Sequence, residues 1–108
     1  TTSDLVANEQ GIINVWKGTY PGGVTGDGLE VLVAKADSSA AADVDDSMSA
    51  SIAEIKKIPA PFDQNLTQDA PDDGPGRTAI KTSIDNLGTQ TDNLVAAAKA
   101  MGLTIEVT

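Results

Sequence analysis

The amino-acid sequence predicts an all-α fold, an antiparallel helical bundle that forms one domain over residues 1–108. Three observations support this prediction. Four segments carry apolar residues at the spacing of one helix face. Glycine or proline stands where three of these segments should stop. The last segment places its apolar residues in alternating steps of three and four, the spacing of helices packed in bundles.

The first predicted helix begins near Ser3, whose side chain can cap free backbone N–H groups, and Asp4 suits its first turn. It ends at Gly18, because Pro21 prevents its continuation. The stripe expected to face inward consists of Leu5, Glu9, Ile12, Ile13 and Trp16. Glu9 is a carboxylate on this apolar stripe. We expect its side chain to extend to the edge of this stripe, to pair with a cation, or to face a site shared with another domain.

A glycine-rich stretch follows, from Gly18 to Gly28. A phosphate-binding loop requires Lys and then Ser or Thr after its second glycine, and here Val24 and Thr25 follow Gly23. We therefore predict a flexible connection between two helices, anchored at its start by Trp16 and Tyr20. The alternative is a loop that lines a functional cleft beside another domain.

Two more helices are predicted before the prolines at positions 59 and 61. A short one follows Asp27 as its cap, and its buried stripe is Leu29, Leu32, Val33 and Ala36. A longer one covers residues 39–58, because Pro59 and Pro61 end it. The apolar face of this longer helix is Val44, Met48, Ile52 and Ile55.

The fourth predicted helix is the clearest, and Gly102 follows it as the stop residue. Its apolar stripe is Ile80, Ile84, Leu87, Thr91, Leu94, Ala98 and Met101. Gly11 and Gly88 interrupt the first and fourth helices, and each costs about 1 kcal/mol relative to alanine. We expect a neighbouring helix to approach closely at both positions. The tail, residues 103–108, alternates like a short extended strap.

The connection between the third and fourth helices contains a pattern like that of a calcium loop. Asp63, Asn65, Thr67 and Asp69 place oxygen ligands on alternate residues. An EF-hand also requires glycine at its sixth position and glutamate at its twelfth, where this sequence has Gln68 and Gly74. The pattern therefore favours a solvated linker over a calcium site.

Composition excludes several classes of function. Sixteen acidic residues against seven basic ones give a formal charge of −9, so nucleic acid is a poor partner. A cation or a basic partner protein suits this charge better. No apolar run approaches the roughly 20 residues of a membrane span. The chain has no histidine and no cysteine, and we expect no catalytic, cofactor-binding or metal-ligating residues in it.

The predicted core is light, because aromatic residues make up only 3% of the sequence. The sequence also begins without methionine or a signal peptide. We therefore expect this domain to be the C-terminal part of a larger protein, produced by processing or by proteolysis, in which another segment completes the core.

Three stretches of the sequence resemble the C-terminal half of imelysin-like proteins, the peptidase M75-type, iron-regulated envelope proteins. The first is a helix that ends in Asn14, Trp16 and Gly18. The second is the segment Gly28, Leu29, Leu32 and Val33, with Asp37 close behind. The third is the phrase from Ile58 to Asp63, Ile-Pro-Ala-Pro-Phe-Asp. The final long helix completes a resemblance that covers nearly the whole chain.

The resemblance implies one repeat of a fold built from two fused helical bundles. It implies a periplasmic or outer-membrane-associated protein linked to iron uptake, whose GxHxxE motif lies in the N-terminal half. That motif cannot lie in a chain without histidine. The resemblance therefore implies that iron or another divalent metal is bound by the missing half, which would be the first partner of this chain.

The residues expected to line a cleft at the joint with that partner are Glu9, Asn14, Trp16 and Tyr20. Three functions remain open on this sequence. The preferred one is a binding or accessory protein of the bacterial envelope concerned with iron. The second is a metallopeptidase of the M75 type with its metal motif in the other segment. The third is a structural helical bundle without a ligand.

Overall fold

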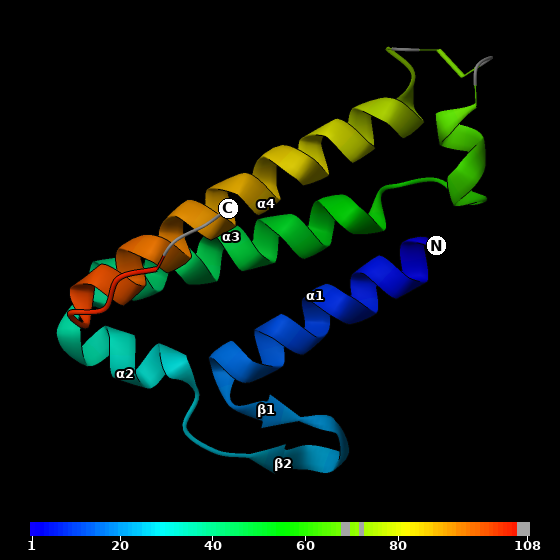
Figure 1. The fold of residues 1–108 in the computed structure, drawn as a ribbon. Helices are drawn as coiled ribbons and strands as arrows, with labels where there is room; N and C mark the ends of the chain where they lie inside the picture. Colours follow the sequence, from blue (N-terminus) through cyan, green and yellow to red (C-terminus); the bar gives the residue numbers. More distant parts are fainter. Residues whose placement is uncertain (68–69, 72, 106–108) are drawn as a thin grey trace.

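The computed structural model describes residues 1–67, 70–71 and 73–105, and within them the chain forms a helical bundle (Figure 1). The helices are α1 (Thr2–Lys17), α2 (Leu29–Ala36), α3 (Ser38–Lys56) and α4 (Pro75–Ala100). Two short strands, β1 (Thr19–Tyr20) and β2 (Val24–Thr25), pair between α1 and α2. Two 3₁₀ turns complete the chain, η1 (Pro21–Gly23) and η2 (Phe62–Leu66). The prediction of an all-α fold is confirmed.

Helix α3 is the centre of the bundle, and both α1 and α4 pack on it in the opposite direction (Figure 1). As a result α1 and α4 run parallel to each other on either side of α3. The short helix α2 packs on α3 and α1 at the end of the bundle where α1 terminates. Each turn of α3 therefore has neighbours on two sides.

The cap of helix α1 is Thr1, two residues before the predicted cap, because Thr1 and Asp4 form a capping box. The Thr1 hydroxyl accepts a hydrogen bond from the Asp4 backbone N–H at 3.3 Å. A cap at Ser3 would put Val6 in the position that Asp4 fills, and valine cannot return the hydrogen bond. The predicted end is correct, since Gly18 adopts the left-handed conformation at φ 76°.

The glycine-rich stretch is a β-hairpin rather than a flexible connection, so this prediction was wrong. Thr19 pairs with Thr25 and Tyr20 with Val24, on either side of η1. Tyr20 does not anchor the stretch, because its side chain is 47% exposed. The hairpin closes through glycine backbone instead, since the Gly26 N–H donates to the Gly18 carbonyl at 2.8 Å.

Helix α2 begins after Gly28 rather than Asp27, and Val33 is its one buried residue. Leu29 and Leu32 are exposed, and so is Ala36, although the sequence predicts all three on a buried stripe. With only eight residues, α2 is too short to turn a second row of side chains toward α3.

Helix α3 matches its prediction closely. It runs from Ser38 to Lys56 with Asp37 as its cap. Val44, Met48 and Ile55 are buried, and Ile52 is half-buried.

Helix α4 turns a different face toward α3 from the predicted one. Its buried residues are mostly small: Gly76, Ala79, Ser83, Gln90, Ala97 and Ala98. The large residues of the predicted stripe lie beside this face, and Ile84 is 62% exposed. Small side chains on both helices, such as Ser51 on α3 and Ser83 on α4, let the two backbones come close. Close contact over a long interface has thus outweighed the burial of a few larger residues.

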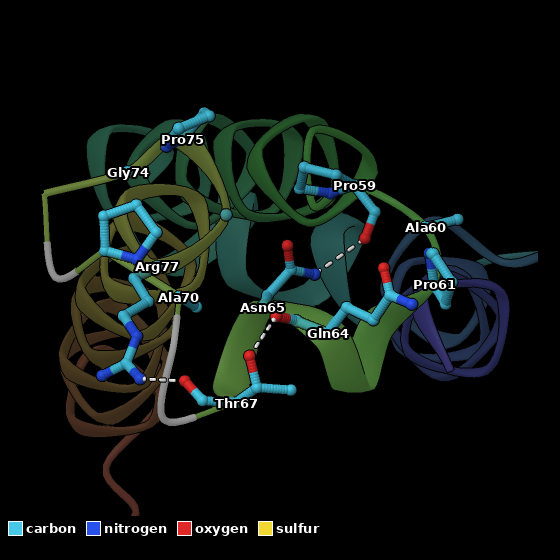
Figure 2. Close-up of a pocket in the computed structure, with 12 residues that line it drawn as sticks. Pro59, Ala60, Pro61, Gln64, Asn65, Thr67, Ala70, Gly74, Pro75 and Arg77 are labelled. Carbon is cyan, nitrogen blue, oxygen red and sulfur yellow. Dashed lines mark hydrogen bonds between the residues drawn. The ribbon is translucent and has the colours of Figure 1, made fainter.

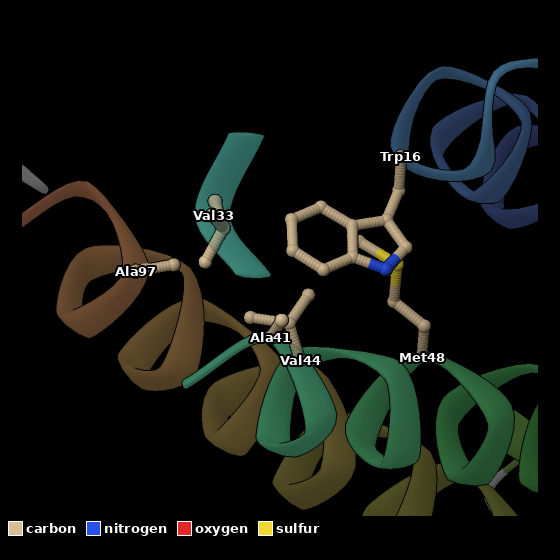
Figure 3. Close-up of a cluster of buried hydrophobic side chains, with 6 residues drawn as sticks. All are labelled: Trp16, Val33, Ala41, Val44, Met48 and Ala97. Carbon is tan, nitrogen blue, oxygen red and sulfur yellow. The ribbon is translucent and has the colours of Figure 1, made fainter. Parts of the chain in front are cut away.

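The main core cluster draws on all four helices (Figure 3). Its buried members are Trp16, Val33, Ala41, Val44, Met48 and Ala97. Figure 3 shows the Trp16 indole lying between α2 and α3, above the Met48 side chain. A smaller cluster of Ile55, Ile58 and Ala79 holds the opposite end, where η2 follows the cis peptide bond between Ala60 and Pro61.

The prediction that a neighbouring helix approaches Gly11 and Gly88 closely was wrong for this chain on its own. A Cβ atom added at Gly11 or at Gly88 would meet no described atom within 4 Å. No helix in the described part of the chain approaches either position closely.

The base of the hairpin gives a direct test of the fold. A Cβ atom at Gly28 would collide with the Trp16 carbonyl and the Gly18 amide, whereas one at Gly26 would meet nothing. We expect Gly28→Ala to lower the free energy of unfolding by about 1–3 kcal/mol, as overpacking of a tight site does. Thermal unfolding followed by circular dichroism measures this loss, with Gly26→Ala as the matched control. Equal stability of the two variants would contradict the hairpin geometry.

Candidate functional site

The first element of the candidate site is a buried carboxylate on α1. Helical spacing turns Val6, Glu9, Ile13 and Trp16 toward the rest of the bundle. Glu9 is only 2% exposed, and its Oε1 accepts a hydrogen bond of 3.3 Å from Nε2 of Gln90 on α4. Gln90 is itself buried, at 4% exposed. A buried polar pair therefore bridges α1 and α4.

This pair leaves two buried acceptor atoms unused. Among the described residues, neither Glu9 Oε2 nor Gln90 Oε1 has a hydrogen-bond partner. Burial raises the pKa of Glu9, and the hydrogen bond from Gln90 offsets part of that rise. An unpaired buried acceptor costs free energy, so a hydrogen-bond donor that reached either atom would stabilise the pair.

Next to the pair, a groove of about 430 Å³ opens between α1 and α4. It is lined by Asn8, Gly11, Ile12, Val15, Trp16, Leu29, Met48 and Leu94. Ile12 and Leu94 follow Glu9 and Gln90 by about one turn on their helices, so the polar pair and the groove share one seam. We call this cavity the α1–α4 groove. Its lining is chiefly apolar, which suits a hydrophobic ligand or side chain.

A charged cluster fixes the other side of Trp16. The indole Nε1 donates to Asp45 Oδ1 at 3.4 Å, and Lys17 Nζ lies 2.6 Å from Asp45 and 2.8 Å from Glu30. The hydrogen bonds that Lys17 donates to Asp45 and Glu30 raise its pKa. Burial by itself would raise the pKa of Asp45, but hydrogen bonding and charge attraction from Lys17 outweigh it and leave that pKa below its ordinary value. These contacts tie α1, α2 and α3 together, which is a structural role.

The structure places the four residues predicted to line a cleft in different surroundings. Glu9 and Trp16 lie on the same inward face of α1. Asn14 lies elsewhere on the helix, where its Oδ1 accepts a hydrogen bond from Gln10 at 2.9 Å. Tyr20 lies exposed on the hairpin. The role of these residues at a joint with a partner stays a prediction.

Gln90 is the residue of this site that sequence reasoning missed. It lies seven residues after Ser83 and seven before Ala97, on the row of small residues that packs on α3. A long amide among small residues at this spacing was an available sign of a buried polar contact. Its partner, 81 residues away, could not be named from the sequence.

A second hollow, of about 640 Å³, lies where the chain returns from α3 to α4 (Figure 2). The Asn65 amide donates to the Pro59 carbonyl at 2.7 Å, and the Arg77 guanidinium donates to the Thr67 carbonyl at 2.8 Å. These hydrogen bonds hold the loop against the start of α4. Gln68 and Asp69, which belong to the calcium-like pattern, lie outside the described residues.

The chain offers a poor donor set for a metal centre. It has no histidine or cysteine, and within residues 1–67, 70–71 and 73–105 no three acidic side chains gather closely enough to hold a metal ion. We therefore derive no metal-dependent step from these residues. None of the helices in the described ranges combines the length and hydropathy of a membrane span.

The fold and site define a class of protein, an all-α bundle that carries a buried carboxylate–amide pair beside an apolar groove. Comparison with protein families then assigns the chain to a family. The family model of imelysin (peptidase M75) matches residues 1–94. The chain belongs to the imelysin family. A search of curated proteins gives no match.

The buried state of Glu9 predicts a pH-dependent stability. The unfolded chain exposes Glu9, which then ionises at a lower pH than in the folded state. Between the two pKa values the folded state keeps a proton that the unfolded state has released, so the contribution of Glu9 to stability falls as the pH rises through this window. At neutral pH the buried charge is therefore destabilising.

We expect Glu9→Gln to raise the free energy of unfolding at pH 7 by about 1 kcal/mol, because its amide can donate to Gln90 Oε1. The gain should shrink as the pH is lowered, because the raised pKa of Glu9 lets the folded state take up a proton on this carboxyl. Thermal unfolding from pH 4 to pH 7 measures the difference. Asp85→Asn, which removes an exposed charge from α4, should show no such trend. A pH-independent effect of Glu9→Gln would contradict the burial of this carboxylate.

Proposed function

We propose that this chain is the C-terminal half of an imelysin-like protein of the bacterial envelope, and that the protein acts as a binding or accessory protein in iron uptake. The observation that carries the proposal is the family match over residues 1–94. The stretches that resemble the C-terminal half, such as the phrase from Ile58 to Asp63, support the placement within the family. Iron is the cargo in this proposal, and the location is periplasmic or outer-membrane-associated.

The partner in this proposal is the N-terminal half of the same protein, which carries the GxHxxE motif and any bound metal. The joint between the halves would use the side of α1 that bears Glu9 and Trp16, with Asn14 and Tyr20 at its margins. Two features support this placement. The α1–α4 groove leaves apolar side chains open, and the Glu9–Gln90 pair leaves two acceptors unused. Both would gain from a covering segment.

A metallopeptidase is the second candidate, favoured by the M75 peptidase class of the matching family. In that case the missing half would supply the histidine and glutamate of the metal site. A structural bundle without ligand is the third candidate. Cleavage of a test protein that stops when a chelator is added would favour the peptidase over the binding protein.

Intact mass measured under native and denaturing conditions tests the two-half proposal on protein purified from its own cells. We expect the native assembly to contain a larger second segment, joined covalently or released on denaturation, that carries GxHxxE. Calorimetric titration of that assembly with ferric citrate should then show saturable binding, lost when the histidine of GxHxxE is replaced. An assembly made of the 108-residue chain alone would overturn the proposal. So would an intact assembly that binds no iron.

A further inference from the structure

The N-terminal part of α1 is held to the bundle by one buried side chain, and that side chain is an acid. Helix α1 has two buried residues, Glu9 and Trp16. The end near Trp16 is fixed by further contacts, because Lys17 forms ion pairs with α2 and α3. Within residues 2–12 only Glu9 is buried, while Val6 is half-buried against the smaller core cluster. The attachment of this part of α1 therefore depends largely on what Glu9 contacts.

The contact that Glu9 makes is half complete. Gln90 Nε2 donates to Glu9 Oε1 at 3.3 Å, while Glu9 Oε2 and Gln90 Oε1 have no hydrogen-bond partner among the described residues. Both unpaired atoms are acceptors as long as Glu9 is ionised, so neither can satisfy the other. A proton on Glu9 Oε2 turns that atom into a donor, and Gln90 Oε1 is an acceptor on the amide that already binds Glu9. The last torsion of each side chain rotates easily, which allows the two groups to align.

A proton suits this position better than a larger group does. Glu9 and Gln90 are 2% and 4% exposed, and neither residue lines the α1–α4 groove. A metal ion or a partner side chain would need space beside the pair, whereas a proton needs no cavity and reaches the carboxyl when the helix opens briefly. A protonated Glu9 is also neutral, which removes the cost of an ionised carboxylate in a buried place.

No charged side chain competes for Glu9 within the part of the chain that the structure describes. The buried side chains of α3 and α4, the helices that face it, are all uncharged. Glu54 of α3 is paired with Lys57 at 2.7 Å. The other charged residues on the start of α1 and on the central turns of α3 and α4 are exposed: Asp4, Asp46, Lys56, Lys81, Asp85 and Asp92. The contact therefore responds to the protonation of one group.

We propose that a proton on Glu9 Oε2 closes the pair into a ring of two hydrogen bonds and holds residues 2–12 against the bundle, and that loss of this proton releases them. The proton passes to water or buffer when the carboxyl ionises, and no other covalent bond changes. Burial raises the pKa of folded Glu9, so the contact is complete at low pH and is lost as the pH rises through that pKa. The inference goes beyond the proposed function, since it depends neither on iron nor on a second segment.

Hydrogen–deuterium exchange of the backbone amides of residues 6–12 measures this release. Exchange is recorded from about pH 4 to pH 8 and corrected for the intrinsic effect of pH on the exchange rate. Opening exposes one carboxyl, which then ionises. We therefore expect the protection of these amides to fall about tenfold per pH unit between the pKa values of released and folded Glu9. Amides at the centre of α3 should stay better protected at every pH, since they exchange only when more of the bundle opens.

Two variants make the exchange experiment specific. Glu9→Gln can form the same two hydrogen bonds with a group that does not ionise. Its protection should be independent of pH and within about twofold of that of the unmodified protein at low pH. Ser51→Ala is the matched control, because it removes another buried polar group without a hydrogen-bond partner among the described residues. The dependence on pH should remain in this control. Circular dichroism checks that each variant folds.

Infrared spectroscopy tests the ring itself. At low pH, the difference between the spectra of the unmodified protein and Glu9→Gln isolates the carbonyl band of protonated Glu9. A carboxyl group whose O–H donates a hydrogen bond absorbs at a lower frequency than an isolated one. The same difference measured in a Gln90→Leu background should therefore show the band at a higher frequency.

Three results would overturn the inference. Protection of residues 6–12 that does not change with pH would show that the proton does not hold this part of α1. A dependence on pH that persists in Glu9→Gln would assign the effect to another group. A Glu9 carbonyl band that does not move in Gln90→Leu would show that the proton is not donated to Gln90. If Gln90→Leu does not fold, the exchange experiment still decides the first two points. A failure of iron binding by the complete protein would affect only the proposed function.

Discussion

The packing of Trp16 is the constraint on which the rest of the structure depends. The indole is buried in the last turn of α1, in the one cluster of described residues that includes side chains from all four helices. Its Nε1 binds Asp45, and the next residue, Lys17, bridges Asp45 and Glu30. Gly18, in the left-handed conformation, then ends α1 and changes the direction of the chain. One turn of helix thus positions α2, α3 and the hairpin, and it leaves the α1–α4 groove along the opposite edge of the indole.

A second consequence comes from the interface between α3 and α4. Ala79, Ser83 and Ala97 bring the two helices close together, and this rotates the larger apolar residues of α4 away from α3. Ile84 and Leu87 remain exposed, while Gln90 donates the hydrogen bond that joins α4 to Glu9 of α1. The same small residues that bind α3 and α4 tightly therefore open an apolar seam beside them. A bundle with a light core and an open seam is well suited to packing against another segment.

The protein that carries this seam is a member of the imelysin family. The chain has no histidine, so the GxHxxE motif that the resemblance implies does not lie in it. The buried acid and its amide partner lie about one helical turn from Ile12 and Leu94, which line the α1–α4 groove.

The sequence by itself determined the all-α class and the family. It also determined one end of each of three helices nearly to the residue, and the unusual position of Glu9. Capping residues, glycine stops and proline breaks act within a few residues, so their effect can be recognised locally. Tertiary structure alone decided that Gly28 meets Trp16 backbone, which makes the glycine-rich stretch a hairpin. It also decided the rotation of α4 and the pairing of Glu9 with Gln90, because these depend on which surfaces fit most closely between distant segments.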